Sequence, residues 1–343
     1  MQAVILVGGQ ATRLRPLTIN TPKSMVPVLN RPFLEYVIQN LSRHGVTEII
    51  LARHHLAGPI ESYLGDGSRF GVGIRYVIEE EARGTAGAIK NVEKYLDGTF
   101  LALNGDIFSD LDITEIVRFH TEQNARATIA LVPVEDPSAY GLIETDLTGR
   151  VRRFLEKPDP GEITTNLINA GTYVLEPEVL AQIPPDVQVS IERETYPLLV
   201  SSGQPVYAFS FAGYWMDVGT SEKYLQLHRD LLSGKSTWYT PGTDEEVLIG
   251  EGCSIDPTAQ ITGPVVIGAG CTVGEGSIVE DSVIWHDVLL GSRVRVQSSV
   301  IADNCTLNDG SIVEGTALGD HVMVVAGGRV EPGSTVEPGE RVG

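Results

Sequence analysis

The chain begins with the stretch AVILVGGQATRLRPLTINTPK, residues 3–23, and this stretch decides how its first domain folds. Residues 3–7 form an uninterrupted apolar run with the length of a buried strand. The run ends at Gly8 and Gly9, where the backbone can turn sharply and lie close to a bound molecule. Three cations follow in the same stretch: Arg13, Arg15 and Lys23. The stretch therefore predicts a strand that runs into a cationic loop with room for an anion.

A phosphate is the anion that best suits this loop, because backbone N–H groups and fixed cations together cradle phosphates. The glycine spacing matches neither the P-loop nor the G-x-G-x-x-G dinucleotide fingerprint. Gly8 and Gly9 alone would also fit a plain strand-to-helix turn with solvated arginines. Pro22 and Lys23, which close the loop, favour the phosphate site.

The composition limits the classes of partner. The chain has 343 residues, enough for two domains, and 42% of them are apolar, enough for a full core. There are 25 Lys and Arg against 45 Asp and Glu, which gives a net charge of −20. Such a surface repels nucleic acid and anionic lipid, so neither is expected as a partner. A phosphorylated substrate must be held by local cations and metal.

A cytoplasmic location is the default expectation from the sequence. No apolar stretch has the length of a membrane span. A strand is predicted from Ala3 onward, with no basic leader or cleavage site ahead of it.

Strand and helix patterns alternate over the first third of the chain. Strands are expected at residues 3–7, 47–51, 73–78, 100–103 and 127–133, and helices at residues 32–44, 56–64, 88–96 and 113–123. This alternation is typical of an α/β fold, a Rossmann-like, mostly parallel sheet with helices on both faces. Ligands of such sheets bind at the carboxyl ends of the strands. Gly8, Gly9 and Asp106 all follow predicted strands, so they are expected to line one crevice.

The pattern changes after Tyr140. Strands are expected at residues 142–145, 151–156 and 206–211 and from residue 169, and helices at residues 190–199 and from about 221 to 232. We interpret residues 140–220 as an insertion that completes a substrate pocket beside the first sheet. Residues 234–246 are rich in turn formers and are predicted to be a linker. Three segments are thus expected: a domain of residues 1–233, the linker, and a domain of residues 247–343.

The last domain is repetitive, with an aliphatic residue at a six-residue period. The period runs through Ile249, Ile255, Ile261, Ile267 and Val273, slips to Ile278, Ile284, Leu290 and Val296, slips again to Ile301, Leu307 and Val313, and continues through Leu318, Val324, Val330 and Val336. This is the sequence signature of a parallel β-helix of hexapeptide repeats. Cys253, Cys271 and Cys305 share the small-residue position of the repeat, so we predict packing roles for all three. Trp285 fits either an exposed contact or a core position.

The motifs resemble those of the sugar-phosphate nucleotidyltransferase family. Residues 7–18 with Pro22-Lys23 are similar to the family signature, and the later motifs follow in family order: Gly84-Thr85-Ala86-Gly87-Ala88, Asn104-Gly105-Asp106, Glu156-Lys157-Pro158, Asn169-Ala170-Gly171 and Trp215-Met216-Asp217-Val218-Gly219. The repeats resemble the left-handed β-helix of longer members. The resemblance covers essentially the whole chain and is greatest to the mannose-1-phosphate guanylyltransferase branch. Ser24 departs from that branch, which usually has proline there, and this bears on loop rigidity more than on chemistry.

The resemblance implies a transfer reaction. A sugar 1-phosphate oxygen attacks the α-phosphorus of a nucleoside triphosphate and pyrophosphate leaves; in the most similar branch, GTP and mannose 1-phosphate give GDP-mannose. The attacking oxygen is already ionised at neutral pH, so no general base is needed, and the motifs contain no histidine. Catalysis of this kind depends on positioning and electrostatics.

The resemblance also implies roles for individual residues. The nucleotide is expected at Leu6, Gly8, Gly9, Gln10, Arg13, Lys23, Glu79, Glu80, Gly84, Thr85 and Asn104, and the sugar phosphate at Gly141, Glu156, Lys157, Asn169 and Gly171. Arg13, Lys23 and Lys157 are the catalytic candidates, since they would hold phosphates and offset the developing charge. Asp106 and Asp217 are the expected ligands of Mg²⁺, which prefers oxygen atoms.

The choice of base is predicted from the acidic stretch before Gly84. A carboxylate accepts two hydrogen bonds side by side, which fits the N1–H and N2–H donors of guanine; uracil and thymine suit glutamine better. Glu79 is the expected reader, and Glu80 fits equally well. A solvated acidic turn over residues 79–81 is the alternative.

Simpler explanations remain open for single motifs. Asp106 would also serve as a helix cap, Asp217 as a cap or turn residue, and Glu156-Lys157-Pro158 as an exposed turn. Two alternative functions are a glucose-1-phosphate thymidylyl- or uridylyltransferase and a non-catalytic subunit that senses nucleotide sugar. The β-helix carries only two histidines, His286 and His321, so assembly into a homo-oligomer is expected of it rather than acyl transfer.

Overall fold

The computed structural model describes residues 1–9, 11–53, 57–79, 81–239 and 246–343. Their contacts divide the chain into two compact units, one of residues 1–9 and 36–215 and one of residues 10–35 and 216–343. The first unit holds the α/β sheet, and the second holds the β-helix together with the loop that follows the first strand. The expected division into residues 1–233, 234–246 and 247–343 stays a prediction, and residues 240–245 of the linker lie outside the described residues.

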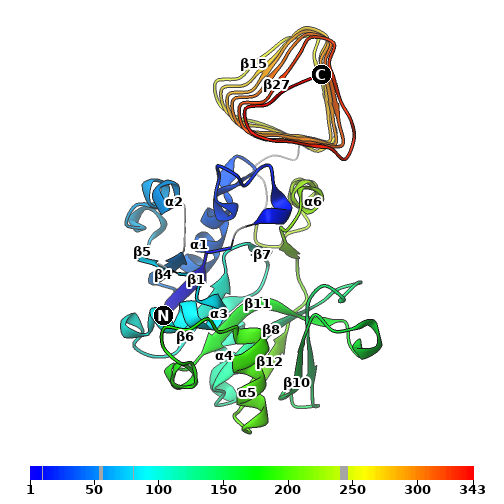
Figure 1. Ribbon diagram of the computed structural model, residues 1–343. Helices are drawn as coiled ribbons and strands as arrows, with labels where there is room; N and C mark the ends of the chain where they lie inside the picture. The colour runs from blue at the N-terminus through cyan, green and yellow to red at the C-terminus, as the bar shows by residue number, and fades with distance from the viewer. Residues whose placement is uncertain (10, 54–56, 80, 240–245) are drawn as a thin grey trace. The chain divides into compact units, whose positions relative to one another are not determined.

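A mixed sheet forms the first unit (Figure 1). Its strands are β1 (Gln2–Leu6), β4 (Glu48–Arg53), β5 (Gly73–Ile78), β6 (Phe100–Asn104), β8 (Ala127–Pro133), β9 (Gly141–Thr145), β10 (Val151–Glu156), β11 (Leu167–Leu175) and β12 (Val206–Ser210). β6, β1, β4 and β5 are parallel neighbours, which confirms the predicted parallel α/β core. β11 lies antiparallel between β6 and β8, and β8 pairs with β12. A short strand, β7 (Ile107–Ser109), follows β6.

Six α-helices lie in the described residues. They are α1 (Phe33–Arg43), α2 (Ala57–Leu64), α3 (Gly84–Asn91), α4 (Ile113–Glu122), α5 (Tyr196–Ser201) and α6 (Ser221–Leu232). The α4 helix begins where the Asp112 side chain accepts the N–H of Glu115, and α6 begins where the Thr220 side chain accepts the N–H of Lys223. Each cap satisfies a backbone donor that the first helical turn leaves unpaired.

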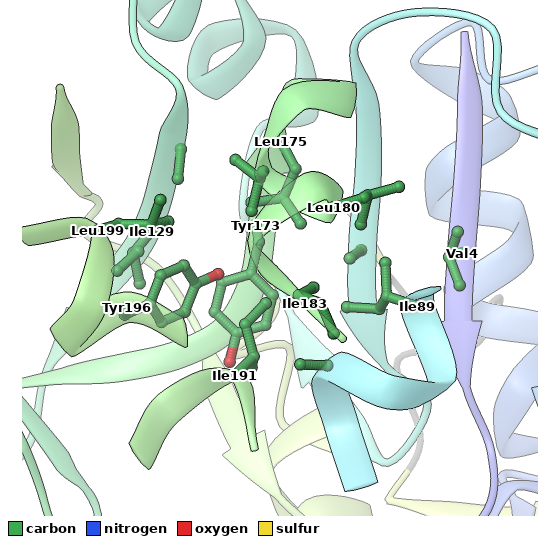
Figure 2. Packing of buried hydrophobic residues seen from close by; sticks show 14 of the residues in the cluster. Val4, Ile89, Ile129, Tyr173, Leu175, Leu180, Ile183, Ile191, Tyr196 and Leu199 are labelled. Atoms are coloured by element: carbon green, nitrogen blue, oxygen red, sulfur yellow. The ribbon is translucent and has the colours of Figure 1, made fainter. Parts of the chain in front are cut away.

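Aliphatic and aromatic side chains from the strands and from α3 and α5 form the core of the first unit. Figure 2 shows Tyr173 of β11 and Tyr196 of α5 among Ile129, Leu175 and Ile191. The two tyrosine rings are tilted, with centroids 5.4 Å apart. Both tyrosines are fully buried, so β11 is an interior strand of the sheet.

Two interpretations of the first unit are wrong. Residues 140–220 do not stand beside the first sheet, because β11 pairs directly with β6 and extends that sheet. The α3 helix begins at Gly84 and not at residue 88, because the glycine-rich motif itself forms its first turn. Gly84 has φ +70°, and the N–H groups of Ala86 and Gly87 donate to the carbonyl of Val189 at 3.0 and 3.3 Å.

The second unit contains a three-sided parallel β-helix, which Figure 1 shows end-on as a triangle. Its three sheets stack β14 (Val247–Ile249), β17 (Val265–Ile267), β20 (Val283–Ile284), β23 (Val300–Ile301), β26 (Ala317–Leu318) and β29 (Thr335–Val336); β15 (Ser254–Ile255), β18 (Thr272–Val273), β21 (Leu289–Leu290), β24 (Thr306–Leu307), β27 (Met323–Val324) and β30 (Arg341–Val342); and β16 (Gln260–Thr262), β19 (Ile278–Glu280), β22 (Arg295–Gln297), β25 (Ile312–Glu314) and β28 (Arg329–Val330). The predicted β-helix is confirmed.

One position in the predicted repeat is wrong. Val279 points into the core with no exposed surface, whereas Ile278 is only half-buried, so the first slip falls after residue 279. The slips come at one corner of the triangle, where Asp281, Ser298 and Gly315 have φ of +47°, +45° and +58°. Three successive coils lose one residue each at this corner.

The cysteines of the β-helix are free thiols. Cys271 and Cys305 are buried, and their S–H groups donate to the carbonyls of Trp285 at 2.9 Å and Gly319 at 3.1 Å. Burial raises the pKa of the Cys271 thiol to about 11 and that of the Cys305 thiol to about 12. Packing roles are therefore confirmed for these two residues, while Cys253 is half-buried.

No helix in the described part of the chain has both the length and the apolar character needed to cross a membrane.

Candidate active site

The cationic loop that follows β1 belongs to the second unit and is built on buried apolar residues. Leu14, Leu17 and Val26 are buried, and the Thr18 hydroxyl donates to the Ala11 carbonyl at 2.9 Å. The loop contains two short 3₁₀ turns, η1 (Thr12–Leu14) and η2 (Lys23–Met25). Arg13 and Arg15 of the loop are exposed and Lys23 is half-buried, so these cations keep surface open to a ligand.

Arg13, Lys23 and Asp217, which are far apart in the sequence, come together in the second unit. The Lys23 ammonium lies 3.5 Å from a carboxylate oxygen of Asp217, and these side chains are 13% and 18% exposed. A methyl group built on Gly219 would lie 3.2 Å from the Arg13 guanidinium and 3.5 Å from Asp217. Gly219 therefore leaves the space that the Arg13 head group occupies. This cluster joins the start of the loop, its end and the Trp215–Gly219 motif.

The glycines at the end of β1 leave an open backbone. Gly8 and Gly9 are exposed, and a methyl group built on Gly9 would meet no atom within 4 Å. Leu6 ends β1 and pairs in register with Asn104 at the end of β6. Gln10 lies outside the described residues.

The Asn104-Gly105-Asp106 motif lies beside the end of β1 in the first unit. The N–H of Gly105 donates to the Leu6 carbonyl at 2.9 Å, and any side chain on Gly105 would lie within 2.7 Å of Val7. Only glycine fits this crossing. It brings the half-buried Asp106 to the carboxyl end of the parallel strands, where ligands of such sheets bind.

The residues expected at the sugar also meet in the first unit. Gly141 of β9 is the register partner of Glu156 of β10, and a methyl group on Gly141 would lie 2.7 Å from the Glu156 carboxylate. Burial raises the pKa of Glu156, and the nearby Glu192 charge adds to this, although Lys157 opposes it. Lys157 is exposed with φ +52°, next to Glu156. Gly171 lies against Asn104, so the nucleotide and sugar motifs are neighbours.

Sequence analysis missed Glu192, which connects these motifs. Its carboxylate accepts hydrogen bonds from the hydroxyls of Thr85 at 2.7 Å, Ser190 at 2.8 Å and Tyr173 at 3.3 Å. The Asn169 amide donates to the same Tyr173 hydroxyl at 2.8 Å. Burial, together with the charge of Glu192, holds the pKa of Tyr173 well above 10, so the phenol stays neutral and keeps its proton to donate.

Glu192 gives no clear signal in the sequence. It lies in a short π-helical turn, Ile191–Thr195, which ends where α5 begins. The wide turn carries Glu192 toward Thr85, whose hydroxyl also accepts the N–H of Ile191 at 2.8 Å. A single π-turn is often found at functional sites, but its position cannot be read from residue periodicity.

The acidic stretch before α3 is described only in part. Glu79 follows β5 and is 6% exposed, so a solvated turn is the wrong explanation for this residue. Glu81 is exposed. Glu80, the other expected base reader, lies outside the described residues.

The described residues contain no group of three or more His, Cys, Asp or Glu that would hold a metal ion by itself. The carboxylates of Asp106 and Asp217 are nevertheless suitable donors, because Mg²⁺ typically binds one or two carboxylates and completes its shell with phosphate oxygens and water. Both side chains are half-buried and keep a solvent-facing surface.

The fold and these clusters define a nucleotidyltransferase. The model of the nucleotidyl transferase family matches residues 2–234, and that of the left-handed β-helix (LbH) domain of EIF2B subunit epsilon matches residues 240–339. The chain therefore belongs to the nucleotidyl transferase family. Its β-helix is of the left-handed type, and members of the family typically use divalent metals.

Within the family, the chain is similar to proteins with named activities. The chain is 38% identical over 293 residues to the mannose-1-phosphate guanylyltransferase of Mycobacterium tuberculosis, covering 84% of this chain and 80% of the relative. It is 35% identical to the UTP–glucose-1-phosphate uridylyltransferase of Synechocystis, covering 88% and 87%. The crystal structure of HddC from Yersinia pseudotuberculosis complexed with GMP-PN superposes with a TM-score of 0.57 at 31% identity, covering 66% of this chain and 97% of that one.

Proposed function

We propose that this enzyme transfers a guanylyl group from GTP to mannose 1-phosphate and releases pyrophosphate. The observation that carries the proposal is the cluster of Arg13, Lys23 and Asp217 around Gly219. Two fixed cations next to a carboxylate suit a triphosphate with a bound metal ion. The name of the Mycobacterium tuberculosis relative also supports guanylyl transfer to mannose 1-phosphate.

Each part of the site has a task in this transfer. Arg13 and Lys23 would hold the triphosphate and offset the charge on the departing pyrophosphate, and Gly8 and Gly9 would present backbone N–H groups to the triphosphate. Lys157 would hold the sugar phosphate, whose oxygen attacks without a base. Glu156 and Asn169 would accept and donate hydrogen bonds at the sugar hydroxyls, with Gly141 and Gly171 leaving room for the ring. Gly84, Thr85, Leu6 and Asn104 would line the nucleotide.

Asp106 and Asp217 would hold Mg²⁺. Bound there, the ion would neutralise phosphate charge during the transfer. The Lys23 ammonium, 3.5 Å from Asp217, would orient that carboxylate before the substrates arrive.

Glu79 would select the base. Its burial supports this role, because a carboxylate shielded from water gains more from the paired N–H donors of guanine than an exposed one. Glu80 is retained as the alternative reader. Uridylyl or thymidylyl transfer to glucose 1-phosphate is the second candidate, favoured by the similarity to the Synechocystis uridylyltransferase. The intact Arg13 and Lys23 oppose a non-catalytic sensor.

The proposal also covers the domains of the chain, its assembly and its location in the cell. We propose a catalytic domain of residues 1–233, a linker of residues 234–246 and a β-helix of residues 247–343 that assembles a homo-oligomer in the cytoplasm. Sedimentation of the full chain at several concentrations tests the assembly, and a purely monomeric chain would contradict it.

The decisive experiment is an assay of pyrophosphate release with Mg²⁺. GTP, UTP, dTTP, ATP and CTP are each combined with mannose 1-phosphate and glucose 1-phosphate. We expect the GTP and mannose 1-phosphate pair to dominate. A dominant UTP and glucose 1-phosphate signal would keep the family and remove Glu79 as a guanine reader, and no turnover with any pair would favour the sensor.

A further inference from the structure

A β-hairpin lies directly after Lys23 in the second unit. Its strands are β2 (Pro27–Val28) and β3 (Arg31–Pro32), and its turn residues Leu29 and Asn30 have φ of +45° and +63°. Left-handed φ at both turn positions is the geometry of a type I′ turn, which favours glycine and asparagine. Leucine is unfavourable there, so contacts outside the hairpin must impose this conformation on Leu29.

The α6 helix supplies one of these contacts. The N–H of Leu29 donates to Nε2 of His228 at 3.3 Å, and Nδ1 of His228 lies 2.8 Å from the Tyr224 carbonyl. These partners require a neutral imidazole with its proton on Nδ1. Burial lowers the pKa of His228 to about 4, in agreement with a neutral ring. Leu29 is 3% exposed, so the contact is shielded from water.

The β-helix supplies the others. The side-chain amide of Asn30 donates to the Ile267 carbonyl at 2.8 Å, and that of Asn20 donates to the Asp320 carboxylate at 3.2 Å. These bonds join the loop, at Asn20, and the hairpin, at Asn30, to coils that are far apart in sequence.

A relay of two buried aromatic residues adds a further connection. The indole N–H of Trp285 donates to the Tyr224 hydroxyl at 3.0 Å, and that hydroxyl donates to the Pro27 carbonyl. Trp285 is 1% exposed and Tyr224 is fully buried, so Trp285 is a core residue and not an exposed contact. The relay connects the β-helix to the hairpin four residues after Lys23.

The α6 helix itself is fixed to the β-helix. The guanidinium of Arg229 donates from Nε and Nη2 to the two carboxylate oxygens of Asp281, at 2.6 and 2.5 Å. A bidentate pair of this kind sets orientation as well as distance. Helix, β-helix and hairpin therefore form one framework under the cationic loop.

We propose that the β-helix positions the loop for the transfer reaction, with Trp285, Tyr224 and His228 as positioning residues that hold Lys23 and Arg13 in place through the hairpin. This inference rests on the proposed function. It gives the β-helix a role within a single chain, separate from assembly. None of the three residues touches a substrate; each acts by limiting how far the loop departs from the geometry that the phosphates require.

The main test combines hydrogen exchange with kinetics on the full chain. Trp285→Phe removes the indole N–H but keeps a ring, and Tyr224→Phe removes only the hydroxyl. Each is expected to speed exchange at the amides of residues 24–32. Each should also lower kcat/KM for the nucleoside triphosphate about tenfold, the worth of one buried hydrogen bond, with less than about a twofold change for the sugar phosphate.

A double-mutant cycle tests the order of the relay. Trp285 acts on the hairpin only through the Tyr224 hydroxyl, so the double variant should be no slower than Tyr224→Phe alone. Multiplied effects would mean two independent contributions and would contradict the relay.

The matched control is Val313→Ala. Val313 is a fully buried β-helix residue that is in none of the bonds described above. It should lower the melting temperature while leaving loop exchange and kinetics unchanged well below that temperature. If Trp285→Phe and Tyr224→Phe behave like Val313→Ala, the β-helix serves only stability and the proposal is wrong.

A variant at an exposed position keeps the proposal testable if the relay variants fail to fold. Asn20 is an exposed residue, so Asn20→Ala should fold normally and change exchange and kinetics in the same direction by a smaller factor. Parental values for both in a folded Asn20→Ala, with relay variants that fail to fold, would overturn the proposal. A parent chain without turnover would refute the proposed function, yet loop exchange in the variants would still decide whether the β-helix holds the loop.

Discussion

The β-helix and the α/β sheet place their residues by different rules. In the β-helix each strand pairs with the strand one coil away, so Val324 meets Val342 and every inward residue repeats its neighbour's environment. In the sheet, β11 pairs with β6, β8 and β9, and its residues come from a segment far along the chain from β6. Local repetition gives the β-helix a regular core, whereas long-range pairing brings unlike residues together and thereby makes a site.

Replacing Lys23 should have the largest effect on function. Lys23→Met removes a cation from the triphosphate site and should lower turnover about a hundredfold to a thousandfold, as loss of a transition-state charge contact does. Stability should change little, because the pair with Asp217 is partly exposed. Lys94→Met, at an exposed lysine, is the control and should keep parental pyrophosphate release. Near-normal turnover in Lys23→Met would show that the cluster of Arg13, Lys23 and Asp217 does not take part in the transfer reaction.

Lowering the pH should reduce the stability of the second unit more than that of the first. His228 has its pKa lowered from 6.5 to about 4, so its contribution to stability is complete above pH 6.5 and is lost as the pH falls toward 4. The difference corresponds to at most about 3 kcal/mol of unfolding free energy. Glu156, with a raised pKa, has the opposite sign, since protonation in acid relieves the penalty of burying its charge.

Urea unfolding followed by hydrogen exchange at pH 7, 5.5 and 4.5 would show this contrast. Amides of the second unit should lose protection first, and His228→Gln should flatten the pH dependence. An equal loss in both units, unchanged in His228→Gln, would show that His228 does not control acid stability.

Shortening a core side chain of the β-helix tests whether equivalent positions in successive coils have the same environment. Val324→Ala, at a fully buried position, should lower the unfolding free energy by about 2–3 kcal/mol. Val342→Ala, its half-buried partner in the last coil, should cost about 1 kcal/mol or less. Thermal unfolding measures both, and equal losses would mean that the coil environments are not graded toward the end.

A change at Glu192 tests whether the residues that long-range pairing brings together in the sheet act as one site. Glu192→Gln keeps the shape but places an amide donor among the hydroxyls of Thr85, Ser190 and Tyr173, so we expect about a tenfold loss in kcat/KM for both substrates. Removing the Glu192 charge should also lower the pKa of Glu156, measured by NMR titration. An unchanged Glu156 would show that the two carboxylates act independently.

The sequence was sufficient for elements set by local patterns. The bounds of β5, β8 and β10 are those predicted, and the six-residue period identified the β-helix. It failed where distant contacts decide. The position of the slip, after Val279, depends on how each coil pairs with the next, and the place of β11 depends on pairing with β6.

The site shows the same division. Family motifs brought attention to Arg13, Lys23 and Asp217, and these residues are neighbours in the structure. Glu192 has no motif and lies on a π-turn, so only the folded chain shows that it accepts from three hydroxyls. Leu29 was missed for a similar reason, because its strained turn is held by partners beyond residue 220.

The anchoring of the hairpin has a consequence for synthesis on the ribosome. Asn30 is made 237 residues before its partner Ile267, and Asn20 is made 300 residues before Asp320. The cationic loop is therefore synthesised early, and most of the chain is translated before the β-helix residues that bind the loop exist. A nascent chain would acquire its sheet first and its phosphate-binding geometry last, which delays catalytic competence until the final coils have left the exit tunnel.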